Sequence, residues 1–228
     1  MTVLDSSSAP DMAKSGTRST WLNLDPERRQ RVLDAAMTEF GKHGYSGGSL
    51  NVIAREAGVS KGSLFQYFED KFAFFAHVAE HASLRIYAEL EPYLDKAERS
   101  SDFREMFAEL VDVWIAYMQA NPLERGLTAA TTLELDPEVR RSVREPVHRL
   151  YAQGIRPLLA DGVATGQLRP DTDVDALLSL LILLLPHLAL APFEPGLDSA
   201  LPLYGTSGPQ RSRQALRLVD TLFAGALR

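Results

Sequence analysis

The sequence predicts an all-α protein, and two features of its patterning support that prediction. Apolar residues recur at three- and four-residue steps along most of the 228 residues, which is the spacing of amphipathic helices. No run alternates apolar and polar residues as a half-buried β-strand would. Hydrophobic residues make up 45% of the chain, enough for one large domain or for a small domain joined to a larger one.

The first predicted helix begins near Pro26. Leu24 can act as an apolar staple and Asp25 as the N-cap, while Pro26 suits the first helical position. Gly41 and Gly44 predict where this helix ends.

A long helix is predicted from Lys71 to about Glu98, with Pro92 placed to bend or end it. The apolar residues expected on one face of this helix are Phe72, Phe75, Ala79, Ala82, Ile86 and Leu90. Five more helices are predicted at about residues 102–120, 123–132, 137–160, 173–190 and 210–227.

The helix at 173–190 is apolar on every side, and it overlaps the one candidate membrane segment, residues 176–193. Ser179, Pro186 and His187 interrupt that segment, and no Lys or Arg flanks it closely. A helix covered on all sides by protein is therefore favoured over a membrane span, and we expect no membrane partner.

Composition excludes several classes of site. The chain has no cysteine, so disulfides, thiolate metal sites and thiol nucleophiles are absent, which suits a reducing cytoplasm. Residues 1–20 mix Asp, Ser, Pro and Lys without an apolar core, and we expect a disordered arm, neither a signal peptide nor an anchor. The formal net charge is -6, yet residues 21–71 carry seven cations and seven anions, so the acidic excess lies in residues 72–228.

The stretch "SLNVIAREAGVSKGSLFQYFEDK", residues 49–71, has the spacing of a helix-turn-helix. Ser49 and Ser60 can cap its two helices, while Gly58 permits the sharp exit between them. Leu64, Phe65 and Phe68 are expected to bury against the first helix. The residues left on or near the outward face, where a recognition helix meets a major groove, are Lys61, Ser63, Gln66 and Tyr67.

The longer stretch "VLDAAMTEFGKHGYSGGSLNVIAREAGVSKGSLFQYFEDKFAFF" resembles the N-terminal domain of the TetR/AcrR family of transcriptional regulators. The positions at family spacing are Ala35, Ala36, Phe40, Gly44, Tyr45, Ile53, Ala54, Ala57 to Ser60, Gly62, Tyr67, Phe68 and Lys71. Two positions depart from the family: Phe65 stands where a tyrosine is frequent, and Gly48 replaces a more usual threonine or alanine.

The resemblance implies a three-helix helix-turn-helix domain at residues 21–70, followed by a larger helical ligand-binding and dimerisation domain at 71–228. It implies that Ser49, Ser60, Lys61, Tyr67 and Lys71 bind operator phosphates. Gln66 is the candidate for base recognition, since its amide can pair with adenine, and Ser63 can contact a base edge or a phosphate. Arg18 in the arm is a candidate for the minor groove.

The resemblance also implies a homodimer formed through the last two long helices. The residues expected at that interface are Leu177, Leu181, Leu184, Leu216, Val219, Leu222 and Phe223. The residues expected to bind an effector are Phe103, Met106, Phe107, Leu110, Trp114, Tyr117, His148, Tyr151 and His187. Because few of them are charged, a hydrophobic or amphipathic effector, such as a fatty acyl compound or a drug, is favoured.

Two other classes of protein compete with a regulator. "HVAEH", residues 77–81, has the order of an inverted zinc protease motif, so a metalloenzyme or metal sensor using His77, Glu80 and His81 is one alternative. The sequence identifies no third ligand, and the two histidines are predicted opposite the buried face, in solvent. A DNA-independent helical interaction protein is the other alternative. We expect a ligand-responsive regulator, a repressor on a palindromic double-stranded operator, with no catalytic residue, metal or cofactor.

Overall fold

A computed structural model describes residues 21–97, 102–201, 203–206 and 208–227 of the chain. The all-α prediction is confirmed: these residues form helices and loops, and the β-structure among them is a single isolated bridge between Leu168 and Leu227. The predicted arm and its Arg18 lie outside the described residues.

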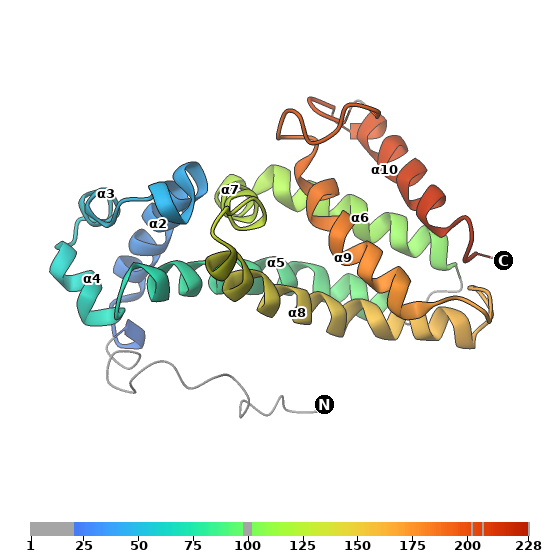
Figure 1. Ribbon diagram of the computed structural model, residues 1–228, viewed down its shortest axis with the longest axis horizontal. Helices are drawn as coiled ribbons and strands as arrows, with labels where there is room; N and C mark the ends of the chain where they lie inside the picture. Colours follow the sequence, from blue (N-terminus) through green and yellow to red (C-terminus); the bar gives the residue numbers. More distant parts are fainter. Residues whose placement is uncertain (1–20, 98–101, 202, 207, 228) are drawn as a thin grey trace.

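Most of the helices follow one another with short connections, whereas a long loop joins α9 to α10 (Figure 1). Their bounds are α2 Pro26–Gly47, α3 Leu50–Glu56, α4 Lys61–Tyr67, α5 Lys71–Ala97, α6 Phe103–Ala120, α7 Pro122–Thr132, α8 Pro137–Ala164, α9 Val174–Leu190 and α10 Gly208–Phe223.

Aspartate side chains begin several of these helices, as their sequence positions predict. Asp25 accepts a hydrogen bond from the Arg28 N–H at 2.9 Å, and Asp102 and Asp173 cap α6 and α9 in the same way. Such caps satisfy N–H groups that have no partner within the helix.

Gly41 does not end α2, but the helix is interrupted at the predicted Gly44, whose φ of 64° and ψ of -174° are not helical, and a short helical piece continues to Gly47. Two other predicted helix ends were wrong. α8 extends past the predicted end at residue 160 to Ala164, and α10 ends at Phe223, before the predicted 227.

Two hydrophobic cores lie along the molecule. The N-terminal core joins α2, α3, α4 and the first half of α5, and it also takes in Leu127 of α7 and Val139 and Val143 of α8. The C-terminal core joins the second half of α5 to α6, α8, α9 and α10. α5 and α8 pack against each other and run along the molecule from one core to the other (Figure 1). Both helices therefore connect the helix-turn-helix end to the larger bundle.

α9 is apolar on all sides but is only partly covered. Leu177, Leu181 and Leu185 are buried, whereas Leu180 and Leu183 are 51% and 67% exposed. Among the described residues, no helix combines the length and the apolarity needed to cross a membrane.

Candidate DNA-binding surface and effector chamber

The corner between α3 and α4 is built from local hydrogen bonds and one left-handed glycine. Gly58 has a φ of 67°, a conformation that residues with a Cβ rarely adopt. The Val59 N–H donates to the Ala54 carbonyl at 2.9 Å, and the Ser60 hydroxyl accepts from the Ser63 N–H at 3.0 Å. The predicted capping role of Ser60 is confirmed, and the corner fixes the direction in which α4 leaves.

The outward face of α4 carries Lys61, Phe65 and Gln66, all of them exposed, while Leu64 is buried. The expected burial of Phe65 was wrong: its side chain is 45% exposed, and the Lys61 ammonium lies 6.0 Å from its ring centroid. On this helix Leu64 fills the side that packs inward, so its neighbour Phe65 points away from the core.

Tyr67 is placed differently from the expectation of an outward side chain. It is only 8% exposed, and its ring lies 5.6 Å from that of Trp21 in an aromatic cluster with Phe68 and His77. Tyr67 therefore anchors α4 to the N-terminal core. Ser63 is half-buried, and its hydroxyl lies 2.8 Å from that of Ser60.

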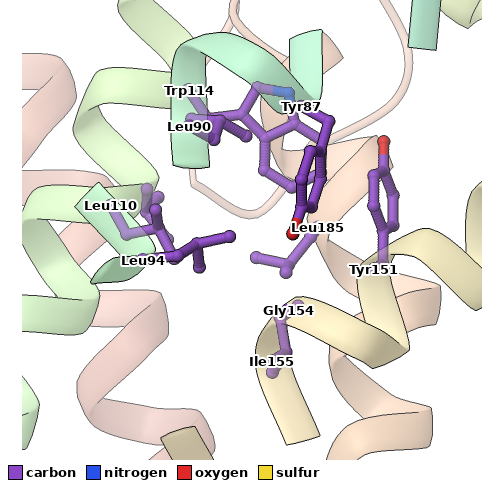
Figure 2. Close-up of a pocket in the computed structure, with 10 residues that line it drawn as sticks. Tyr87, Leu90, Leu94, Leu110, Trp114, Tyr151, Gly154, Ile155 and Leu185 are labelled. Atoms are coloured by element: carbon purple, nitrogen blue, oxygen red, sulfur yellow. The ribbon is translucent and has the colours of Figure 1, made fainter. Parts of the chain in front are cut away.

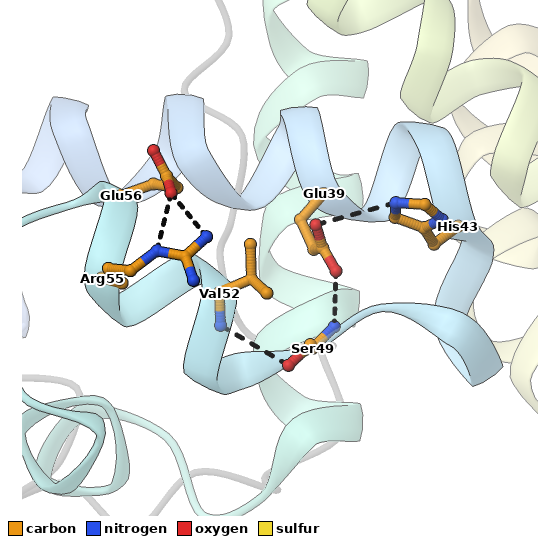
Figure 3. Close-up of polar contacts among 6 residues, drawn as sticks. All are labelled: Glu39, His43, Ser49, Val52, Arg55 and Glu56. Carbon is orange, nitrogen blue, oxygen red and sulfur yellow. Dashed lines mark hydrogen bonds and ion pairs between the residues drawn. The ribbon is translucent and has the colours of Figure 1, made fainter.

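Glu39 holds the start of α3 against α2 (Figure 3). Its buried carboxylate accepts from the Ser49 N–H at 2.9 Å, and His43 Nε2 lies 3.9 Å from its other oxygen. The Ser49 hydroxyl in turn accepts from the Val52 N–H at 3.5 Å, so Ser49 caps α3 as predicted. Because Glu39 accepts from the Ser49 N–H, that group is not free for a phosphate.

Lys71, at the start of α5, makes contacts within the protein. Its ammonium donates to the Ser46 carbonyl at 3.2 Å and lies 4.9 Å from the Tyr45 ring centroid. Burial lowers the pKa of Lys71, although the charges of Glu134 and Glu39 oppose that shift. The Lys71 ammonium has three N–H donors, so its bond to Ser46 leaves donors for a phosphate.

An apolar chamber lies in the C-terminal core, where α5, α6, α8 and α9 meet (Figure 2). Its empty volume is about 440 Å³, open solvent at the mouth included, and the side chains around it leave little free space inside. The residues that line it are Tyr87, Leu90, Leu94, Leu110, Val111, Trp114, Tyr151, Gly154, Ile155 and Leu185. Trp114 and Tyr151 meet edge to face, with ring centroids 5.2 Å apart.

Comparison with known proteins follows the same division of the chain. The family "Bacterial regulatory proteins, tetR family" matches residues 32–78, and the family "Tetracyclin repressor-like, C-terminal domain" matches residues 104–191. Together the two matches span more than half of the chain. The chain belongs to the TetR family.

Individual relatives of this TetR-family protein are also transcriptional regulators. The transcriptional repressor AcnR of Corynebacterium diphtheriae is 29% identical over 66% of this chain and 73% of its own. The transcriptional repressor Rv1474c of Mycobacterium tuberculosis is 28% identical over 85% of this chain and 91% of its own. The protein is thus a helix-turn-helix transcriptional regulator.

Solved structures share the fold at lower identity. FadR of Bacillus subtilis, a transcriptional regulator in complex with stearoyl-CoA, superposes with a TM-score of 0.66 at 16% identity. That match covers 86% of this chain and 98% of FadR.

Of the predicted effector residues, Leu110, Trp114 and Tyr151 line the chamber of this TetR-family protein. Phe103 and Phe107 instead pack against Phe223 at the far end of α6, with centroid distances of 5.1 and 5.0 Å.

The other predicted effector residues do not line the chamber. Met106 is buried in the C-terminal core. Tyr117 lies near Arg85 and Glu124, and burial raises its pKa. His187 is exposed, with Nδ1 3.0 Å from the Leu183 carbonyl oxygen. His148 lies one turn from Tyr151, beside Arg144.

Several chamber residues were missed because no single helix reveals them. The lining residues that were not proposed as effector contacts are Tyr87, Leu90, Leu94, Val111, Gly154, Ile155 and Leu185. Gly154 is the one residue whose sequence position could have indicated the chamber, since a glycine inside a helix marks a place where another group approaches closely. A Cβ at Gly154 would lie 2.9 Å from Leu94 Cδ1 and 3.6 Å from Tyr87 Cε2.

The predicted dimer residues need correction. Leu177, Leu181, Val219 and Phe223 are buried within the subunit's own core, so they have no surface to offer a partner. Leu184, Leu216 and Leu222 are half-buried. The strongly exposed leucines of α9, Leu180 and Leu183, were not selected because an all-apolar helix gives no indication of which side faces outward.

The histidines of "HVAEH" do not lie on a solvated face, contrary to expectation. The His77 ring packs 5.5 Å from that of Trp21, and His81 Nε2 is buried without a hydrogen-bond partner. Within the described part of the chain, no group of three or more His, Cys, Asp and Glu residues is placed to hold a metal ion. The metalloprotein alternative is therefore not supported.

Proposed function

We propose that this protein is a dimeric repressor that binds a palindromic operator through α4 and leaves it when a hydrophobic effector enters the chamber. Residues 21–70 form the DNA-binding domain in this proposal, and residues 71–228 the ligand-binding and dimerisation domain. The observation that carries it is the exposed face of α4, where Lys61, Phe65 and Gln66 are free of the core while Leu64 and Tyr67 anchor the helix.

Each of the three exposed side chains is suited to a different part of the DNA. Lys61 is suited to a phosphate, and the Gln66 amide to an adenine edge in the major groove. Phe65 offers an apolar surface beside them, which fits the methyl group of thymine. We also propose contacts to the DNA phosphate backbone from Ser49, Ser60, Ser63, Tyr67 and Lys71. Most of their polar groups already form hydrogen bonds within the protein.

The coupling to an effector is proposed to run through α5 and α8. Tyr87, Leu90 and Leu94 of α5 line the chamber, while Phe74 and Phe75 of the same helix are buried in the N-terminal core. A ligand that favours a different position of α5 would change the separation of the two recognition helices of a dimer. Half-sites lie about 34 Å apart for such dimers, so a small pivot mismatches them. FadR shows that this fold accepts an acyl ligand in another protein.

The test is operator binding by a variant of Gln66, whose side chain is exposed. An operator is first selected from genomic fragments with the wild-type protein. Gln66→Ala should then lower affinity for that operator by about 1–3 kcal/mol, the cost of one base contact, without a change in melting temperature. Gln153→Ala is the matched control, because Gln153 is an exposed glutamine of α8.

The outcomes separate this proposal from the alternatives. Wild-type affinity should fall steeply with salt, since phosphate contacts release counterions. Operator affinity that is equal in Gln66→Ala and Gln153→Ala would refute base recognition by α4. The absence of salt-dependent DNA binding would instead favour a DNA-independent interaction protein.

A further inference from the structure

Arg144 is a buried cation without an acidic partner, and it lies behind the chamber wall, next to Tyr151. Its side chain lies on α8 and the residue is only 7% exposed. No described Asp or Glu lies within 4.0 Å of its guanidinium. Glu145, the next residue in the chain, is exposed and lies 4.0 Å from Arg149 instead. Burying an unpaired charge is costly, so such a group points to a missing anion.

The strongly buried carboxylates of the described residues show how the chain offsets this cost elsewhere. Glu124 is paired with Arg85 at 2.9 Å, and Glu39 accepts from the Ser49 N–H at 2.9 Å. Arg211, the other strongly buried cation of the described residues, also has no acidic partner and donates to the side-chain oxygen of Gln119. Arg144 has only two uncharged neighbours, His148 Nε2 at 3.3 Å and the hydroxyl of Tyr151. Two acceptors cannot use the five N–H groups of a guanidinium.

The polar groups around Arg144 that remain unsatisfied are donors. A guanidinium can only donate, so the Tyr151 oxygen accepts from it and keeps its own O–H for another acceptor. Burial raises the pKa of Tyr151 to about 12, which keeps that proton in place at neutral pH. Trp114 Nε1, in the same wall of the chamber, is a buried donor without a partner. Trp114 Nε1 is thus a buried donor that lacks an acceptor close to the ring of Tyr151.

The remaining walls of the chamber are apolar. Leu90, Leu94, Leu110, Ile155 and Leu185 surround the space next to Trp114 and Tyr151 (Figure 2). A ligand suited to both parts must carry an acceptor-rich anion at one end and a hydrocarbon at the other.

We propose that the effector is an amphipathic carboxylic acid, whose carboxylate binds Arg144 and the Tyr151 hydroxyl while its apolar chain enters the chamber as the side chains around it move apart. A carboxylate matches the single charge and the planar donor pair of a guanidinium. This inference rests on the proposed function only in taking the chamber as an effector site. Arg144 follows Val143 of the N-terminal core and precedes Val147 of the C-terminal core, so the anion would sit where the two cores meet.

The experiment compares acids and alcohols of equal chain length. Octanoate, decanoate and dodecanoate are titrated into the full chain by calorimetry near neutral pH, each beside the corresponding alcohol. Trp114 and Trp21 are the two tryptophans, so Trp21→Phe leaves Trp114 as a local fluorescence reporter. We expect at least one acid to bind about tenfold or more tightly than its alcohol and to change the Trp114 emission, because a carboxylate makes charge-assisted hydrogen bonds that a hydroxyl cannot.

The deciding variant is Arg144→Met, with Arg149→Met as its matched control on the exposed side of α8. Arg144→Met should lose the preference for the acid, about tenfold or more, and keep the affinity for the alcohol. Its melting temperature without ligand should not fall, since an unpaired buried charge is replaced by an apolar side chain. Arg144→Lys, which keeps the charge, should retain part of the acid preference.

Equal affinity for acid and alcohol, or an acid preference that survives in Arg144→Met, would overturn the proposal. Absence of binding by every acid would do so as well. Operator binding is measured separately: acid binding without any effect on the operator would contradict the proposed release mechanism and leave the carboxylate site standing.

Discussion

At the scale of single residues, Gly48 shows why the protein departs from its family. A Cβ at this position would lie 2.5 Å from Phe40 Cδ1 and 2.9 Å from the Gly44 carbonyl oxygen. Phe40 is fully buried between Phe74 and Phe75, so its ring has no room to retreat. The threonine or alanine usual in the family does not fit beside this phenylalanine.

Gly48→Ala should therefore destabilise the fold by about 2 kcal/mol, as overpacking of a filled core does. Chemical denaturation measures the change. Gly47→Ala is the control, since a Cβ there meets only His43 Cβ at 3.3 Å on an exposed turn. Equal stability of the two variants would show that the Phe40 ring moves aside.

We expect the side chain of Phe65 to contribute to operator affinity and not to the stability of the fold. Because this side chain is 45% exposed, Phe65→Ala should leave the free energy of unfolding within about 0.5 kcal/mol. Its operator affinity should fall about fivefold, with relaxed preference at one thymine, because an apolar base contact is lost. Competition binding against operators substituted at each position measures this. Unchanged affinity would place Phe65 outside the protein–DNA interface.

At the scale of elements, α2 and α7 cross at a pair of glycines. A Cβ on Gly41 would lie 3.1–3.3 Å from the backbone of Gly126 and Leu127, whereas a Cβ on Gly126 would lie 3.6 Å or more from Gly41. The DNA-binding end and the larger bundle therefore meet backbone to backbone. Nearby, the Tyr45 N–H donates to the carboxylate of Glu134 at 3.1 Å, which ties α2 to the loop before α8.

Alanine should have opposite effects at the two glycines. Gly126→Ala should be neutral or stabilise the protein by up to about 1 kcal/mol, the helix-propensity gain. Gly41→Ala should destabilise it by about 1–3 kcal/mol, because backbone atoms cannot move aside as a side chain can. Thermal and urea unfolding give both values. A Gly41→Ala protein as stable as Gly126→Ala would show that α2 and α7 separate freely.

His81 on α5 predicts a pH dependence of stability. Burial lowers its pKa, and of the charges that face it Arg85 and Arg29 lower it further while Glu124 and Asp34 raise it. The folded state thus holds the proton less tightly than the unfolded state, whose pKa is about 6.5. The stability from neutral His81 is present above that pH and is lost as the pH falls through the folded pKa.

His81→Gln should therefore lose less stability than wild type between about pH 7.5 and pH 5. His43→Gln, which replaces an exposed histidine, is the control and should behave like the wild type. Urea denaturation at the two pH values measures the difference. An acid-induced loss as large in His81→Gln as in wild type would assign it to other groups, of which His148 is one, since burial also lowers its pKa.

The helices themselves were predictable because their signals are local. Asp25 was recognisable as a cap, the starts of two other helices were placed near Asp102 and Asp173, and the corner around Gly58 followed from one glycine and two serines. The orientation of a short helix was less predictable: α4 has seven residues, and Phe65 was assigned to the wrong side of it. The lining of the chamber was predicted only in part, by Leu110, Trp114 and Tyr151, because the rest depends on which four helices meet.

At the scale of the whole molecule, α9 exposes Leu180 and Leu183 on the same side of the helix as the exposed Ala176 and His187. Exposed apolar side chains that lie together mark an interaction surface, and we propose this one as part of the dimer interface. Leu183→Lys should give a monomer by light scattering and weaken operator binding, because one half-site no longer supports the other. A dimer of unchanged affinity would place the interface elsewhere.

The most direct test of the account as a whole is the affinity of the protein for its selected operator, measured with and without the acid that binds the chamber. The account predicts that the acid weakens operator binding about fivefold or more in the wild type, in the range of coupling of about 1–3 kcal/mol that linked sites show. Arg144→Met should bind the operator but respond less to the acid. Operator affinity that stays constant while Trp114 reports a filled chamber would contradict the account.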